Sequence, residues 1–180
     1  MIRLATPGDG GAVAAIYRPY VEETTITFEV AAPDEREMRS RIATTLERYP
    51  WLVWDDGGVR GYAYATAHRT RAAYQWSVDA AVYVDQNYHR RGIGRALYLA
   101  LFPILVRQRF VNVYAGITLP NDRSVGLHEA VGFRLVGTYR NVGFKLGQWR
   151  DVGWWHRSLQ PLPPAPQPPL AMGDIGGGAQ

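Results

Sequence analysis

One segment in the middle of the chain constrains the fold more than any other part of the sequence. The apolar strand at residues 82–84 runs through a basic, glycine-containing turn into a stretch with helical spacing of apolar residues. A helix that begins directly after a strand presents free backbone N–H groups and the positive end of its dipole at the turn. Gly92 and Gly94 let a ligand approach the backbone closely, and positive charge comes from Arg90, Arg91 and Arg95. The segment predicts an α/β chain that binds phosphate at this turn.

Composition limits the class of protein. The 180 residues, 47% of them apolar, suit one globular domain. No apolar run is long enough to cross a bilayer, and residues 1–7 lack the apolar core of a signal peptide, so a cytoplasmic protein is expected. The chain has no cysteine, which excludes disulfides, a thiolate nucleophile and cysteine metal ligands. Nearly all of its positive charges are arginines, which bind phosphate or carboxylate bidentately.

The residue pattern predicts, in chain order, a strand, two helices, three strands, a helix, a strand, a helix and two strands. Thr6-Pro7 and Pro33-Asp34 are typical helix starts after the strand at 2–4. Asp-Asp-Gly-Gly between two apolar runs indicates a hairpin of residues 51–54 and 59–65. The later elements are strand 75–84, helix 94–107, which Pro103 should kink or shorten, strand 111–117, helix 124–131 and strands 134–139 and 152–156. This order predicts an α/β (α+β) fold with an antiparallel front half and a crossover behind it.

Residues 160–180 differ in composition from the rest of the chain. Prolines crowd the first half of this segment, and glycines fill its end. Such a segment has too few apolar side chains to form a core. We therefore expect one folded domain over residues 1–159 and a disordered tail over residues 160–180.

Two familiar phosphate-binding folds do not fit the turn. A dinucleotide-binding fold has its glycine turn in the first strand–helix unit, with an acidic residue about twenty positions later. Here the turn lies in mid-chain, no such acid follows, and the Gly-Lys-Ser/Thr of a nucleoside-triphosphate loop is missing. A pyrophosphate-bearing acyl carrier such as coenzyme A remains, because it needs backbone donors but no metal.

At these residues the chain resembles the GCN5-related N-acetyltransferases. The run His-Arg-Arg-Gly-Ile-Gly at 89–94 is similar to that family's acetyl-CoA motif, with histidine where the family has glutamine or arginine. Residues 121–133 are similar to the family's asparagine-containing helix that closes with Gly-Phe. The resemblance implies the family's fold, a mixed, mostly antiparallel central sheet flanked by helices, and acetyl-CoA as the co-substrate.

Further motifs resemble the phosphinothricin and methionine sulfoximine acetyltransferases within that family. They include Arg-Tyr-Pro-Trp-Leu-Val at 48–53, Ala-Tyr-Gln-Trp at 73–76 and Gly-Gln-Trp-Arg-Asp-Val-Gly at 147–153, and the likeness covers nearly the whole domain. It implies an enzyme that moves the acetyl group to the α-amino group of a small amino acid analogue: phosphinothricin, methionine sulfoximine or methionine sulfone. It also implies a homodimer and a link to herbicide resistance.

Acetyl transfer from a thioester to an amine needs a proton acceptor near neutral pH and a donor to the developing oxyanion. With no cysteine to carry the acetyl group, we expect direct attack in a ternary complex. The resemblance assigns proton transfer, as base, acid or both, to His128, and histidine titrates in the useful range. It also places Asp79 where the group has a proton-accepting glutamate, and the shorter side chain indicates a water link.

The resemblance also assigns binding residues. An oxyanion donor is expected from the backbone of residues 82–84, and Asn121 is expected to orient the cofactor arm. The full cofactor-binding set is Val82, Tyr83, Val84, Arg90, Arg91, Gly92, Ile93, Gly94, Arg95, Asn121 and Ser124. The substrate positions are Phe28, Arg71, Tyr74 and Tyr83, of which the arginine suits a carboxylate and the aromatic rings shape a side-chain slot. His68 and Arg69 are expected in a solvated loop, and the histidines lack metal-ligand spacing, so no metal is expected.

Other functions stay open at this point. The same chemistry could serve another small amine or a protein N-terminus, although Arg71 disfavours a cationic substrate. A basic module that binds acyl-CoA or nucleic acid without catalysis is compatible with an isoelectric point of about 9.5. The sequence has no recognition-helix pattern or dense basic stripe, so we expect neither a nucleic-acid nor a membrane partner.

Overall fold

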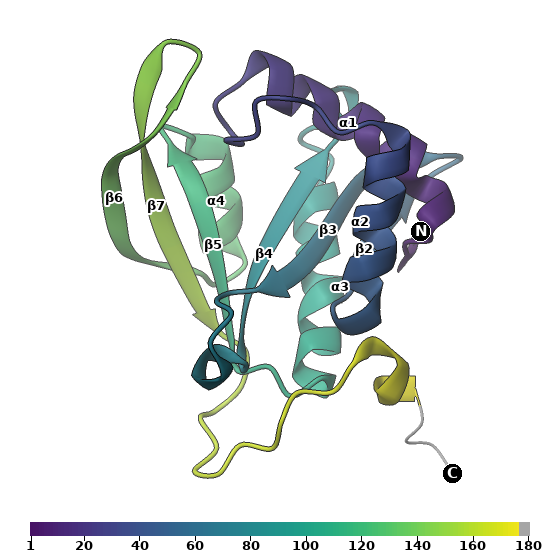
Figure 1. Cartoon of the computed structure of the whole chain (residues 1–180), viewed down its shortest axis with the longest axis vertical. Coiled ribbons are helices and arrows are strands. Elements are labelled where there is room, and N and C mark those ends of the chain that lie inside the picture. The colour runs from purple at the N-terminus through teal and green to yellow at the C-terminus, as the bar shows by residue number, and fades with distance from the viewer. Residues whose placement is uncertain (177–180) are drawn as a thin grey trace.

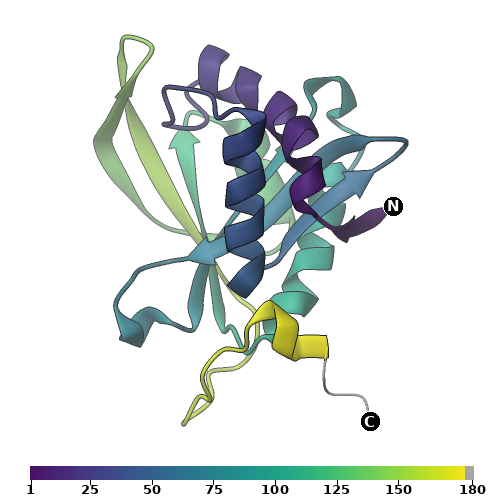
Figure 2. The same cartoon turned by 45° about the vertical axis from the view of Figure 1, so that its right-hand side comes forward.

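A computed structural model describes residues 1–176 of the chain, and within them seven strands form one sheet in the order β1-β2-β3-β4-β5-β7-β6. Every neighbouring pair is antiparallel except β4 and β5. Helices lie on both faces of the sheet (Figures 1 and 2). The elements are β1 (Ile2–Leu4), α1 (Gly10–Glu23), α2 (Glu35–Arg48), β2 (Trp51–Asp55), β3 (Val59–Ala67), β4 (Ser77–Val84), α3 (Ile93–Arg107), β5 (Asn112–Leu119), α4 (Asp122–Ala130), β6 (Arg134–Lys145) and β7 (Gln148–Ser158). The predicted fold class and element order are confirmed.

Each face of the sheet has its own hydrophobic core. Trp51 and Val53 of β2 pack with α1 and α2, whereas Leu52 packs with α3 on the opposite face. This division follows from the strand itself, because successive side chains point to opposite sides. Among residues 1–176, no helix is both long and apolar enough to cross a membrane.

Several element boundaries differ from the prediction. A short 3₁₀ helix, η1 (Pro7–Asp9), precedes α1 and holds a capping box between Thr6 and Asp9. Helix α3 continues through Pro103 to Arg107, so the expected shortening does not occur. Strands β6 and β7 extend to a tight hairpin, because Gly147, with a φ of +74°, allows the chain to reverse there.

Strands β4 and β5 run parallel but stay together only briefly. Their pairing ends at Asp79, which lies opposite Tyr114. Beyond that point β4 remains paired with β3 as far as Val84, and β5 remains paired with β7 as far as Leu119. The two strands therefore diverge (Figure 1), and each keeps one unpaired edge along the divergence.

The described part of the proline-rich segment runs along the end of the domain near the C-terminus of α3 (Figures 1 and 2). Leu170 exchanges two hydrogen bonds with Gln108, at 2.9 and 3.0 Å, and the Gln167 carbonyl accepts one from the Trp76 indole at 2.9 Å. The 3₁₀ helix η4 (Met172–Gly176) lies against α2. These are the contacts of an ordered strap, which differs from the expected disorder. Residues 177–180 of that segment lie outside the described residues, and the domain boundary near 159 stays a prediction.

Candidate active site

The unpaired edge of β4 offers backbone donors to a ligand. The N–H of Asp85, directly after β4, donates to the carbonyl of Arg60 at 2.9 Å, so the backbone groups of residue 85 point toward β3. Backbone groups of an antiparallel strand alternate in direction, so those of Val82 and Val84 point away from β3 into the divergence. The Val84 carbonyl accepts a hydrogen bond from the Tyr20 hydroxyl at 2.6 Å. The N–H groups of Val82 and Val84 therefore point toward the divergence, where a ligand's carbonyl could accept from them.

The glycine turn brings the N-terminus of α3 to the same place. Gly92 is its N-cap and has a φ of +76°, a left-handed conformation in which a side chain would be strained. The first bond of the helix runs from Ala96 N–H to the Gly92 carbonyl, so the preceding N–H groups face outward at the positive end of the dipole. A Cβ on Gly94 would stand 3.0 Å from the side chain of Leu127 on α4. The geometry suits an anion that approaches the backbone closely.

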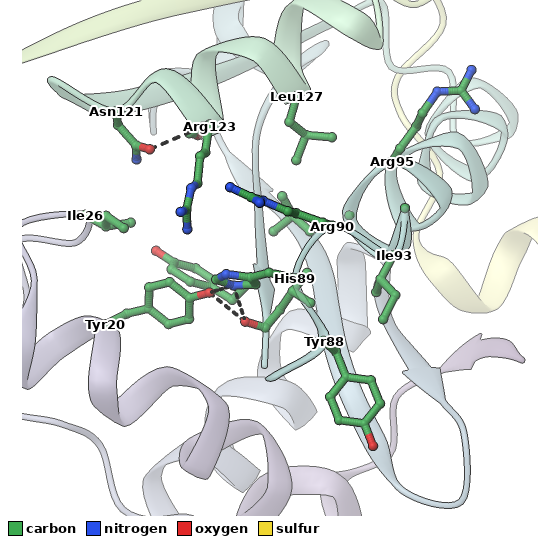
Figure 3. A pocket seen from close by; sticks show the side chains of 16 residues that line it. Tyr20, Ile26, Tyr88, His89, Arg90, Ile93, Arg95, Asn121, Arg123 and Leu127 are labelled. Carbon is green, nitrogen blue, oxygen red and sulfur yellow. Dashed lines mark hydrogen bonds between the residues drawn. The ribbon is translucent and has the colours of Figure 1, made fainter. Parts of the chain in front are cut away.

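A cavity of about 450 Å³ opens between the β4 edge, the α3 N-terminus and α4. Ten of the eleven predicted cofactor-binding residues line it; the exception, Arg91, has its guanidinium over the ring of Tyr88, 4.7 Å from the centroid. Figure 3 shows Arg90 reaching into the cavity, whereas Arg95 extends away from it. Sequence reasoning missed six lining residues, namely Tyr20, Ile26, Tyr88, His89, Arg123 and Leu127.

Two of the missed residues, Arg123 and His89, contribute a positive charge and a set of hydrogen bonds to the cavity wall. Arg123, on the first turn of α4, points toward Arg90 across the cavity (Figure 3), and the basic turn motif does not include it. His89 occupies the motif position at which the family has glutamine or arginine. Its Nε2 lies 2.9 Å from the Tyr20 hydroxyl and 3.2 Å from the Val84 carbonyl. His89 thus connects the glycine turn to α1 and to the end of β4.

Asn121 and Ser124 combine binding and structural contacts. The side-chain oxygen of Asn121 accepts from the N–H of Ser124 at 3.2 Å and so caps α4. Both residues line the cavity. The asparagine in this motif therefore fixes the start of the helix that carries Arg123.

His128 lies behind the cavity wall, with only 4% of its surface exposed. Its Nδ1–H donates to the Ser124 carbonyl at 2.7 Å, which leaves Nε2 to accept from the Tyr98 hydroxyl at 2.8 Å. Burial lowers the pKa of His128, so the ring is neutral near pH 7. Its neighbour Leu127, rather than His128, lines the cavity. The proton-transfer role of His128 stays a prediction, and its contacts are those of a core side chain.

Asp79 pairs with a residue that the sequence placed in a solvated loop. Nδ1 of His68 lies 2.6 Å from the Asp79 carboxylate. Asp79, the last residue of β4 that pairs with β5, thus carries a half-buried carboxylate. This side chain faces the same side of the sheet as Tyr83, because side chains alternate along a strand and the two residues are four positions apart. Burial raises the pKa of Asp79, and the hydrogen bond from His68 opposes that shift.

The predicted substrate residues fall into two groups. Tyr74, in the 3₁₀ helix η2 (Ala72–Tyr74), lies edge-on to His68 with ring centroids 6.1 Å apart, and Arg71 is the N-cap of the same helix. Tyr83 lines the cavity, and Phe28 packs against Gly143 of the β6–β7 hairpin. Asp79 and Tyr83 are separated by about 13 Å, at about 3.3 Å per residue along β4. The two groups therefore flank the divergence from opposite ends.

Metal ligands do not cluster in the part of the chain that the structure describes: no group of three or more histidine, aspartate or glutamate side chains there could hold an ion. The chemistry available to the site consists of backbone donors, arginines, a paired carboxylate and aromatic walls.

Comparisons with known proteins agree with this geometry. The family model described as the acetyltransferase (GNAT) domain matches residues 2–154. A phosphinothricin N-acetyltransferase of Streptomyces viridochromogenes is 42% identical over 171 residues, which cover 94% of this chain and 93% of that protein. An L-methionine sulfoximine/L-methionine sulfone acetyltransferase of Pseudomonas aeruginosa is 32% identical over 168 residues, covering 92% and 98% of the two chains.

A solved structure adds a likeness of the whole fold. The crystal structure of a GNAT superfamily phosphinothricin acetyltransferase from Sinorhizobium meliloti, in complex with AcCoA, matches with a TM-score of 0.84. The two sequences are 35% identical, and the match covers 88% of this chain and 87% of that one. With its fold, its divergent strands and its glycine turn, the chain belongs to the GNAT acetyltransferase family.

Proposed function

We propose that this protein is an N-acetyltransferase that moves the acetyl group of acetyl-CoA to the α-amino group of a small amino acid analogue. Phosphinothricin, methionine sulfoximine and methionine sulfone are the proposed substrates. One observation carries the proposal: β4 diverges from β5 at Asp79, so one strand presents both free backbone donors and a proton-accepting carboxylate. The names of the relatives at 42% and 32% identity support the substrate class.

The residues that line the cavity suit coenzyme A. The α3 N-terminus and Arg90 would hold the pyrophosphate, and Arg123 would add a second guanidinium to phosphate oxygens. The free edge of β4 would hold the amide-bearing arm as an added strand does. Bound there, acetyl-CoA supplies an activated acyl group. A backbone N–H of this edge, that of Val82 or that of Val84, would then donate to the thioester carbonyl as its oxygen gains negative charge.

The substrate's amine must lose a proton before it attacks. We assign that proton to Asp79, reached through one water, because its carboxylate is held by His68 and faces the same side of the sheet as Tyr83. Direct attack in a ternary complex follows, since the chain offers no cysteine to carry the acetyl group. We assign the substrate's carboxylate to Arg71 and its side-chain slot to Phe28, Tyr74 and Tyr83.

Steady-state kinetics with acetyl-CoA and each of the three proposed substrates test the assignment, with release of the CoA thiol as the readout. We expect turnover with at least one of them and acetylation at the α-amino group by mass spectrometry. Polyamines and N-terminal peptides serve as the comparison set. Turnover of these alone would contradict the substrate class but not the acetyl transfer.

We also propose a homodimer that associates through β6 and β7. β6 is an edge strand of the sheet, and more than half of the surface of each of seven large apolar residues on this hairpin is exposed. They are Leu135, Val136, Tyr139, Val142, Phe144, Leu146 and Trp149. A second copy of the same surface is the natural occupant, because a two-fold interface pairs a patch with itself. Light scattering should give twice the chain mass, and Val136→Glu with Val142→Glu should give monomers; a wild-type monomer at micromolar concentration would contradict the proposal.

The remaining parts of the proposal follow from the reaction. An enzyme that draws on the acetyl-CoA pool of the cell is placed in the cytoplasm, with no nucleic-acid or membrane partner. Acetylation of phosphinothricin would make the chain a herbicide-resistance determinant. Survival of a sensitive host that expresses the wild-type chain, compared with the Asp79→Asn variant, tests this point.

A further inference from the structure

The pair formed by His68 and Asp79 is built more firmly than a loop contact. The imidazole of His68 stacks on Tyr114 with ring centroids 4.4 Å apart and 19° between the planes. Trp154 closes one side edge-on at 5.9 Å. Only 14% of the His68 side chain is exposed, although the residue follows the last residue of β3. Side chains from three strands, β4, β5 and β7, therefore hold the ring in place.

The position of the ring shows which of its nitrogens donates to Asp79. A carboxylate only accepts hydrogen bonds, so the Nδ1–H of His68 donates to Oδ1 of Asp79 at 2.6 Å. Among residues 1–176 no protein donor to the second oxygen, Oδ2, is found. Because 28% of the Asp79 side chain is exposed, Oδ2 can accept from a water or an amine. One oxygen is thus held and the other is available.

The charges around the pair favour an ionised carboxylate. Arg69 lies over the ring of Trp154, and its charge lowers the pKa of Asp79 in the same direction as His68 does. On the neighbouring strands stand Tyr64, Tyr114 and His156. Burial lowers the pKa of His156, which is neutral near pH 7 and bonds Asn112 at 2.8 Å. Among the residues that the structure describes, the Nδ1–H of His68 is the one protein donor bonded to the carboxylate.

We propose that His68 is a positioning residue for acetyl transfer: its Nδ1–H fixes the Asp79 carboxylate and leaves Oδ2 to take the amine's proton. The inference rests on the proposed function and deepens it at the same site. His68 forms no bond with the substrate. It acts through Asp79, in the way that an orienting group acts on a catalytic base.

Two substitutions separate the hydrogen bond from the packing. His68→Phe keeps an aromatic ring on Tyr114 but removes the donor, whereas His68→Asn keeps a donor, Nδ2, near the position of Nδ1. The measurement is kcat/KM for the amine from pH 5 to 9, at saturating acetyl-CoA, with thermal unfolding to confirm the fold of each variant. The amine's own titration is common to all variants and cancels in the ratio to wild type.

The proposed role of His68 fixes the direction in which the pH profile of kcat/KM should shift. Activity requires ionised Asp79 and falls as the pH drops through its pKa, so loss of the donor moves that fall to higher pH. We expect a shift of about one pH unit in His68→Phe, seen as a roughly tenfold loss at pH values below the wild-type pKa of Asp79 and a loss below about threefold at pH 9. His68→Asn should restore most of the wild-type profile.

Other outcomes overturn the inference or the function separately. An unshifted profile in His68→Phe, or an equal shift in both variants, would reduce His68 to a packing residue. A normal profile in Asp79→Asn would remove the carboxylate from the mechanism while leaving the enzyme an acetyltransferase. Absence of acetylation by the wild type would instead contradict the proposed function itself.

Discussion

The hydroxyl of Tyr98 lies 2.8 Å from Nε2 of His128, and both side chains are buried. The opposite ring nitrogen is occupied as well, because Nδ1–H donates to Ser124. A histidine with both nitrogens used inside the core has no atom left for the cavity. The pair therefore couples α3 to α4 below the cofactor cavity, and the predicted role in proton transfer can be tested against this structural one.

His128→Phe should destabilise the fold more than it changes the chemistry. The variant leaves the buried Tyr98 hydroxyl without its partner, which costs about 1–3 kcal/mol, and removes the bond to the Ser124 carbonyl, which contributes about 0.5–1.5 kcal/mol. We expect a loss of about 2–4 kcal/mol in the free energy of unfolding, measured in urea. The pH profile of kcat/KM should keep its acidic limb. A native-like stability together with a drop of about 10²–10⁴-fold in kcat would instead identify His128 as the proton-transfer group.

Arg123→Ala should weaken the binding of acetyl-CoA. A hydrogen bond to a charged group contributes about 1.5–3 kcal/mol when well formed, and partial exposure in the cavity reduces it, so KM for acetyl-CoA should rise about tenfold. Added salt should narrow the difference from wild type. Arg107→Ala, at the exposed far end of α3, is the matched control. Arg91→Ala should raise the KM for acetyl-CoA less than about twofold, since its guanidinium lies on Tyr88. Equal increases in this KM for the Arg91 and Arg123 variants would show that Arg91 also binds acetyl-CoA.

A chain that ends at residue 159 should be less stable than the full chain. It loses the two bonds between Gln108 and Leu170 and the bond from Trp76 to Gln167. At about 0.5–1.5 kcal/mol each, these bonds predict a loss of about 2–4 kcal/mol. The control ends at residue 176 and keeps every one of them. Equal urea midpoints for the two shortened chains would show that the strap contributes nothing to stability.

The ion pair of Asp9 and Arg3 should make stability depend on acid. The guanidinium of Arg3, 2.7 Å away, lowers the pKa of Asp9 to about 2. A depressed pKa stabilises the fold above the unfolded value of about 3.9, and this contribution is lost as the pH falls toward 2. We expect a contribution of up to about 2 kcal/mol at pH 7. Urea unfolding of wild type and Asp9→Asn at several pH values measures it, and parallel curves for the two proteins would exclude it.

Much of the fold could be predicted because its signals are local. The glycine turn, the Asp55-to-Gly58 hairpin and the capped helix starts each depend on a few neighbouring residues. The late strands were predicted too short, because the β6–β7 hairpin carries exposed apolar residues and lacks the usual alternation. The proline-rich strap was missed since its order comes from Gln108 and Trp76, far away in the sequence.

The sequence by itself determined the strand–turn–helix unit around Gly92, because backbone conformation, free N–H groups and helix dipole arise within one stretch of chain. Only the tertiary structure decided which side chains reach the reaction. It brought His68 onto Asp79, turned Arg123 into the cavity and buried His128 against Tyr98. The physical reason is that a side chain's exposure and hydrogen-bond partners depend on elements that arrive from elsewhere in the chain, and no local spacing encodes them.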